Sequence, residues 1–286
     1  MRKIYSEILG EYVELPDKPT RIVSLAPSIT ETLYLLGLEQ RIAAVSHFCN
    51  KPEEAKQKPR IGSYFQVNTR KLEEIEPDLI LVTTGAQRKL ALDLHAKGYK
   101  VYPVPLPTSI YGIIDNTITI GHVTNAIEPA RRLARVLARK AVLLEGQVMN
   151  NPRIYYEIWL GGPVTIGAYS YITDALNHIG ATTCFEDHEQ PWIINPDPEQ
   201  VKQCRPDIIL YEIPPYSENI IKLIEKSIKE RGLDKNKILA IPPDSLAHYG
   251  PDLFNILEDL VLKLNGKTPV KTQIISFEEL LGYKTT

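Results

Sequence analysis

The sequence has 286 residues, of which 43% are hydrophobic, and its formal net charge is only −2. This length accommodates one large or two medium domains with substantial buried cores. The balanced charge, without a long basic run, argues against a nucleic-acid-binding protein. No apolar segment approaches the ~20 residues that span a bilayer. We therefore expect the protein to contact a membrane only through a partner. We also expect a monomer.

The ends and the cysteines limit the cellular compartment only loosely. Residues Met1–Glu7 contain no apolar run of signal-peptide length, so we expect a cytoplasmic protein if the chain is complete as given. If an export signal has been removed, we expect an extracytoplasmic protein. Cys49, Cys184 and Cys204 are odd in number, far apart and without a CxxC motif. We expect three small core residues, no disulfide scaffold and no metal site.

Short apolar runs bounded by proline, glycine or polar residues alternate with helical patterns, which is typical of α/β folds with parallel sheets. The first helical pattern opens with Ser28-Ile29-Thr30-Glu31, which matches a capping box. The predicted strands are Arg21–Leu25, Ile42–Val45, Leu79–Val82, Lys100–Val104, Ile154–Ile158, Ile208–Tyr211 and Ile238–Ile241.

A different segment separates the two groups of strands. Residues Asn125–Val148 are rich in Ala, Leu, Arg and Glu, which are strong helix formers, and Pro129 falls in the first turn. A helix of this length measures about 36 Å, enough to join two lobes, although a long surface helix within one domain is the alternative. We expect an N-terminal lobe (1–124), a backbone helix (125–150) and a C-terminal lobe (151–286).

Two segments of the chain repeat one another. Glu76–Leu81 reads Glu-Pro-Asp-Leu-Ile-Leu and Arg205–Leu210 reads Arg-Pro-Asp-Ile-Ile-Leu, and a helical stretch precedes each. An aromatic residue lies upstream of each proline, Tyr64 in the first half and Trp192 in the second. We expect two related lobes with one aromatic residue each at an equivalent strand end, where open α/β sheets bind ligands.

These features resemble a known family. The stretch Tyr12–Gly37, the Glu-Pro-Asp-Leu-Ile-Leu segment, the long central helix and Pro191-Trp192 are similar to the helical-backbone (class III) periplasmic substrate-binding proteins. Members of that family are the substrate-binding subunits of ABC importers for cobalamin, haem and ferric siderophores. The resemblance implies two Rossmann-like lobes with parallel sheets joined by one long backbone helix. It also implies capture of a metal chelate for a permease rather than catalysis. We expect little closure of the lobes, because one long helix that spans them resists wide hinge bending.

The cobalamin-binding branch of the family looks most similar. The resemblance implies ligand contacts from Tyr64 after Ser63, from Trp192 after Pro191, and from Asp244 and His248 before Pro251. The family has an arginine where this chain has His248, so a contact to a corrin amide or to cobalt stays open there. We add Phe48, on the loop after a predicted strand, and Trp159, near a Gly-Gly-Pro turn, as candidate ligand contacts.

The resemblance also implies docking on the permease through surface carboxylates. Glu199 fits the position in the second lobe, whereas the equivalent first-lobe position is Arg70, with Glu73 and Glu74 nearby. A receptor used outside an importer is therefore a second interpretation of these residues.

The sequence contains none of four common enzyme motifs and is compatible with three functions. GxSxG, GxxxxGK[ST], HExxH and GxGxxG are all absent from the sequence. A corrinoid receptor ranks first. A receptor for haem or a ferric siderophore ranks second, because haem-binding relatives have a tyrosine where this chain has Ser63. An enzyme that processes a metal chelate on a related fold ranks third.

Overall fold

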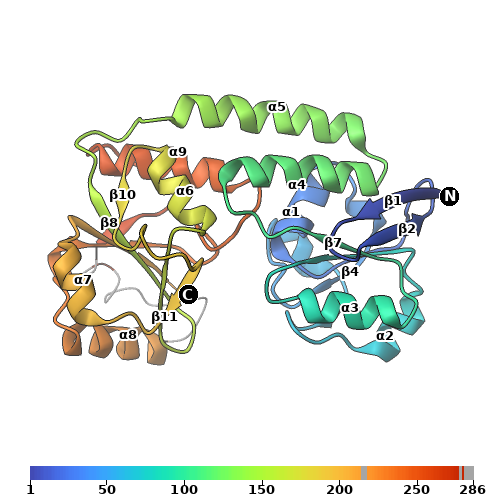
Figure 1. Cartoon of the computed structure of the whole chain (residues 1–286), viewed down its shortest axis with the longest axis horizontal. Coiled ribbons are helices and arrows are strands. Elements are labelled where there is room, and N and C mark those ends of the chain that lie inside the picture. The colour runs from blue at the N-terminus through green and yellow to red at the C-terminus, as the bar shows by residue number, and fades with distance from the viewer. Residues whose placement is uncertain (214–217, 277–278, 280–286) are drawn as a thin grey trace. The chain divides into compact units, whose positions relative to one another are not determined.

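A computed structural model describes residues 1–213, 218–276 and 279, and the chain divides into two compact units (Figure 1). Unit 1 comprises residues 1–107 and 111–139, and unit 2 comprises residues 108–110 and 140–286. The division falls after Arg139 inside helix α5 (Ile127–Leu144), so one continuous helix contributes residues to both units. Each unit contains a sheet covered by helices, parallel in unit 1 and mixed in unit 2, which is the α/β fold class that the sequence predicts.

Unit 1 is built on a parallel five-stranded sheet in the order β5-β4-β3-β6-β7, beside an antiparallel hairpin of β1 and β2. Its strands are β1 (Arg2–Ser6), β2 (Glu11–Leu15), β3 (Ile22–Ser24), β4 (Ile42–Ser46), β5 (Arg60–Gly62), β6 (Leu79–Thr83) and β7 (Val101–Val104). Its helices are α1 (Pro27–Leu35), η1 (Glu39–Arg41), η2 (Glu53–Gln57), α2 (Thr69–Ile75), α3 (Arg88–Ala96), α4 (Ile110–Val123) and the first part of α5.

Both faces of this sheet are buried, which explains why its strands read as continuous apolar runs. On one face Leu79 and Leu81 pack in a core cluster with residues of α1 and α4, and on the other Ile80 and Val82 pack with residues of α2 and α3. The helices lie accordingly on the two sides of the sheet (Figure 1).

Unit 2 contains a mixed sheet in the order β11-β9-β8-β12-β13-β14, with β10 paired to β8. Strands β8, β10, β12 and β13 are parallel to one another, whereas β9, β11 and β14 pair antiparallel to their neighbours. The strands are β8 (Arg153–Trp159), β9 (Pro163–Ile166), β10 (Thr182–Thr183), β11 (Trp192–Ile194), β12 (Ile208–Glu212), β13 (Ile238–Ile241) and β14 (Ile275–Ser276). The helices are α6 (Tyr171–His178), α7 (Pro198–Cys204), α8 (Glu218–Glu230), η3 (Lys235–Lys237) and α9 (Leu253–Leu264).

The repeat seen in the sequence is also a repeat in the structure. Helices α2 and α7 each end in a left-handed residue, Glu76 (φ 47°) and Arg205 (φ 52°), which precedes the Pro-Asp pair. Asp78 then accepts a hydrogen bond from the backbone N–H of Arg21 at 2.9 Å, and Asp207 accepts one from the N–H of Arg153 at 2.8 Å. In both units the aspartate therefore ties the start of the following strand to the start of its neighbour.

Two predictions about local structure are wrong in detail. The helix expected over 125–148 is confined to Ile127–Leu144, because Asn125 (φ 55°) and Gly146 (φ 62°) have left-handed backbones that a helix cannot contain. The capping box is absent: α1 begins at Pro27 after Ala26, and no side chain caps it. A proline at the first helical position has its φ already set for a helix, so α1 starts one residue before Ser28.

The prediction for the cysteines is half right. Cys49 is a buried free thiol, as expected, and burial raises the pKa of that thiol. Cys184 and Cys204 instead form a disulfide with a Cα–Cα distance of 5.5 Å. Cys204 is the last residue of α7 and Cys184 directly follows β10, so the fold brings together two cysteines that are 20 residues apart.

Candidate functional site

In unit 1 the candidate site is an aromatic cluster at the carboxyl edge of the sheet. Phe48 lies two residues after β4 and Tyr64 lies two residues after β5, so the structure brings these predicted residues together. Their ring centroids are 6.3 Å apart with the planes perpendicular, and Phe65 approaches Tyr64 in the same edge-on manner at 5.4 Å. Phe48 is 43% exposed and Phe65 63% exposed. An apolar surface is thus offered where parallel α/β sheets bind ligands.

Polar side chains of β5 and of the residue before α3 hold the loops that carry this cluster. The side-chain amide of Gln87, which is fully buried, donates to the backbone oxygens of Tyr64 at 2.9 Å and Leu25 at 2.8 Å. Its oxygen accepts from the N–H of Thr83 at 2.9 Å. The Arg60 guanidinium donates to the backbone oxygens of Ser46 and Cys49, which flank Phe48 in sequence. The cluster therefore rests on a fixed backbone.

In unit 2 the predicted polar residues lie on the loop after β13. Asp244 is half-buried with a left-handed backbone (φ 53°), and His248 is only 4% exposed. The Glu212 carboxylate, at the end of β12, accepts hydrogen bonds from three successive backbone N–H groups of this loop, residues 245–247. Asp244 and His248 thus bracket a segment of backbone that a buried carboxylate holds.

The two tryptophans face opposite sides of the sheet of unit 2. Trp159 pairs with Pro163, whereas Trp192 pairs with Ile166, and residues alternate between faces along a strand. Trp159 packs against the core cluster that includes residues of α7 and α8, so its observed contacts are those of a core residue. Trp192 begins the antiparallel strand β11, whereas Tyr64 follows the end of β5, so the two aromatic residues do not lie at equivalent strand ends as expected.

The carboxylates expected to dock on a permease are exposed on the two equivalent helices. Glu199 lies in the first turn of α7 and forms an ion pair with Lys202 at 2.8 Å. Glu73 and Glu74 lie on α2, and Glu74 contacts the Arg70 guanidinium at 3.4 Å. Because α2 and α7 occupy equivalent positions in the two units, these acidic groups belong to matching surfaces of the repeat.

Glu157 is the second fully buried carboxylate on the central strands of unit 2. Its register partner is Tyr211, so it faces the side of the sheet opposite to Glu212. The Arg231 guanidinium, at the end of α8, donates two hydrogen bonds of 2.6 Å to its two oxygens. The Tyr155 hydroxyl donates a third at 2.5 Å. This charge is therefore fully paired, and it does not contact the 244–248 loop.

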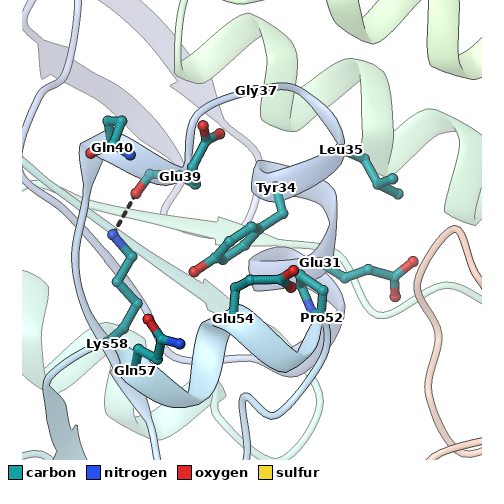
Figure 2. A pocket seen from close by; sticks show the side chains of 10 residues that line it. All are labelled: Glu31, Tyr34, Leu35, Gly37, Glu39, Gln40, Pro52, Glu54, Gln57 and Lys58. Carbon is teal, nitrogen blue, oxygen red and sulfur yellow. Dashed lines mark hydrogen bonds between the residues drawn. The ribbon is translucent and has the colours of Figure 1, made fainter.

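A pocket of about 850 Å³ lies elsewhere in unit 1, between the end of α1 and η2 (Figure 2). Tyr34 lies at its centre beside Glu54, and burial, followed by the charges of Glu54 and Glu39, raises the pKa of its hydroxyl. Lys58 donates to the backbone oxygen of Glu39 at 2.6 Å, while the Glu31 and Leu35 side chains extend away from the Tyr34 ring. The pocket contains none of the predicted ligand residues, and its polar groups do not converge.

Sequence reasoning missed Phe65, Gln87 and Glu212. Phe65 has a signal, since it directly follows Tyr64 and makes a pair of consecutive aromatics in a loop. Glu212 has a weaker one, an acidic residue that ends an apolar strand before two prolines. Gln87 has none, because its role depends on three chain segments that only the fold brings together.

Among the described residues, no helix is long and apolar enough to cross a membrane.

Comparison with known proteins gives one family match and several relatives. The model of the family described as "Periplasmic binding protein" matches residues 22–235. The cobalamin-binding protein of Halobacterium salinarum is 27% identical over 204 residues, which cover 66% of this chain. The match spans only 55% of that relative's own length.

Solved structures show the same fold at lower identity. The periplasmic vitamin B12-binding protein of Vibrio cholerae superposes with a TM-score of 0.71 at 23% identity, covering 86% of this chain and 97% of that one. The periplasmic haem-binding protein RhuT of a Roseiflexus species superposes with a TM-score of 0.75 at 20% identity, covering 86% and 98%. At such identities the two structures agree on the fold and leave the ligand open.

Proposed function

The chain belongs to the periplasmic binding protein family, and on that premise we propose that it captures a corrinoid of the cobalamin type for an ABC-type importer. The relative from Halobacterium salinarum is named for cobalamin binding, and the solved structure from Vibrio cholerae is named for vitamin B12 binding. We propose a binding protein without catalysis, because the family and these relatives are named for binding and the sequence lacks the enzyme motifs sought above.

The observation that carries the proposal is the cluster of Phe48, Tyr64 and Phe65 at the carboxyl edge of the sheet in unit 1. A corrin is a broad plate with apolar faces and a fringe of amides. Aromatic rings remove such faces from water, and each fully buried side chain contributes roughly 1.5–3 kcal/mol. The cluster thus provides an apolar surface suited to one face of the plate.

Unit 2 supplies the polar contacts and one further ring in this proposal. Asp244 accepts a hydrogen bond from a corrin amide, and His248 bonds a second amide or coordinates cobalt through a neutral ring nitrogen. Trp192, half-buried at the start of β11, adds an apolar contact, whereas Trp159 supports the sheet from its core side. A small number of placed polar groups on an apolar surface is the usual composition of a small-molecule site.

The disulfide supports an extracytoplasmic location. Disulfides such as Cys184–Cys204 persist in oxidising compartments and are rare in the cytosol.

The disulfide lies at the end of α7, the helix that carries Glu199. We propose that Glu199 on α7, with Glu73 or Glu74 on α2, contacts a permease. Because α5 runs unbroken through the boundary of the units, we also propose capture with little closure.

The test is calorimetry against cobalamin, cobinamide, haem and a ferric siderophore, side by side. We expect stoichiometric binding of cobalamin with a change in its visible spectrum. Tyr64→Ala is expected to weaken that binding by about 1.5–3 kcal/mol. Tyr5→Ala is the matched control, because Tyr5 is an exposed tyrosine on the hairpin of the same unit. If the protein binds haem or the siderophore but not cobalamin, the proposed corrinoid ligand is wrong. If it chemically converts any of the four compounds, the proposal that it is a binding protein without catalysis is wrong.

A further inference from the structure

Glu212 is a fully buried carboxylate with four hydrogen-bond donors directed at it. It ends β12 and is 0% exposed. One oxygen accepts from the N–H of Ser245 at 2.9 Å. The other accepts from the N–H groups of Leu246 at 3.0 Å and Ala247 at 2.9 Å, and from the Tyr156 hydroxyl at 2.8 Å. Four donors match the roughly four acceptor sites of one carboxylate, and three of them are successive backbone N–H groups, so this group fixes the backbone around it.

The backbone that it organises is the loop with the proposed polar contacts. Asp244 directly precedes the first of the three N–H donors, and His248 directly follows the last. The loop is fixed from a second direction, since the Tyr171 hydroxyl on α6 donates to the backbone oxygen of Leu246 at 2.6 Å. A shift of these three peptide groups would move both side chains, because Asp244 and His248 are attached to the two ends of the same segment.

We propose that Glu212 is a positioning residue for ligand binding, which acts by holding residues 245–247 so that Asp244 and His248 meet the ligand correctly. This inference rests on the proposed function and deepens it. Glu212 is not itself a ligand contact. Its role resembles that of the hydrogen-bond partners that orient the ligands of metal sites, whose loss weakens binding although they touch nothing bound.

The ionisation of Glu212 gives this role a recognisable pH dependence. Burial raises the pKa of Glu212 to about 7, although its hydrogen bonds to Tyr156 and to the loop act to lower it, and the charge of Asp244 acts to raise it further. The titratable groups around Glu212 and this loop include Tyr156 on β8, Tyr171 on α6, and Asp244 and His248 on the loop itself. When Glu212 is protonated, its own O–H is a donor that competes with the four donors directed at the carboxyl group. The hydrogen bonds that hold residues 245–247 therefore weaken as pH falls below about 7. Ligand affinity is expected to weaken with it.

The test compares Glu212→Gln with Glu157→Gln in the full chain. Both changes neutralise a fully buried carboxylate on a central strand, but only Glu212 touches the loop. In Glu212→Gln one oxygen becomes an amide that faces an N–H donor, so we expect faster hydrogen exchange at 245–247 and cobalamin affinity lower by roughly tenfold or more. We also expect the step in affinity near pH 7 to disappear. Glu157→Gln should keep that step.

Two further variants separate this role from simpler ones. His248→Ala removes the histidine of the loop, and the step near pH 7 should persist in the affinity that remains. Tyr156→Phe removes one donor that favours the charged carboxylate, so the midpoint of the step should move to higher pH. This second variant keeps the shape of the core, and it tests the inference even where Glu212→Gln does not fold.

The outcomes distinguish this inference from the proposed function. Wild-type protein that binds none of the four ligands refutes the proposed function. Wild-type protein that binds cobalamin, while Glu212→Gln binds it equally at every pH, refutes the positioning role alone. Unchanged exchange at 245–247 in Glu212→Gln, or an unmoved midpoint in Tyr156→Phe, also refutes it.

Discussion

Removal of the Cys184–Cys204 disulfide should destabilise the protein by an amount set by the length of chain that it closes. The two cysteines are 20 residues apart in sequence, and the loss of chain entropy in the unfolded state for such a loop corresponds to about 3 kcal/mol at 25 °C. The closed loop contains β11 and α7, so the bond limits the freedom of the helix that carries Glu199. We expect the double variant Cys184→Ser/Cys204→Ser to lose about 3 kcal/mol of unfolding free energy.

Urea unfolding, followed by circular dichroism, measures this loss in the double variant and in wild-type protein with and without dithiothreitol. Reductant should shift the wild-type midpoint to lower urea and leave the double variant unchanged. Thiol titration in denaturant provides the control, because only Cys49 is free. One thiol is expected from unreduced wild-type protein and three after reduction. Three thiols without reductant, or identical midpoints with and without it, would refute the reasoning.

Three more predictions follow from the structure. Trp192→Ala should weaken cobalamin binding by about 1–3 kcal/mol, by analogy with base–aromatic stacking, and an unchanged calorimetric isotherm would remove Trp192 from the site. Arg231→Met should destabilise the fold by about 3–5 kcal/mol, because it leaves the buried Glu157 charge unpaired; urea unfolding should show recovery when Glu157→Gln is added. Because the pKa of Glu212 is raised to about 7 in the folded state, that state binds more protons than the unfolded chain between about pH 4.5 and 7. Its contribution to stability should therefore be fully present below about pH 4.5 and lost by about pH 7, a loss of about 3 kcal/mol that is absent in Glu212→Gln.

The predicted strands are all present in the structure because their signal is local. Strands β3, β4, β6, β7, β8, β12 and β13 are short apolar runs that end at turn residues, and most are covered by helices on both faces. The strands missed on sequence grounds are the hairpin, β5, β9, β10, β11 and β14. Of these, β5, β11 and β14 lie at sheet edges and β10 has only two residues, whereas β9 is an interior strand that begins at Pro163 directly after a turn.

The sequence named Phe48 and Tyr64 as separate candidate ligand contacts and did not predict that they lie side by side. Phe48 follows β4, which was predicted, but Tyr64 follows β5, which was not, so only the structure shows that a parallel sheet brings the two residues to one edge. Trp159 and Trp192 look alike in sequence, but the antiparallel register of β8, β9 and β11 places them on opposite faces.

The sequence by itself determined the fold class and the repeat of the Pro-Asp turns, because each depends on residues that are close along the chain. Only the tertiary structure decided that Cys184 meets Cys204, that Gln87 holds the Tyr64 loop, and that Glu212 holds the loop before His248. These contacts join segments whose separation in space depends on strand order and register. A pairing of distant groups becomes visible only when the sheets and helices that carry them have packed together.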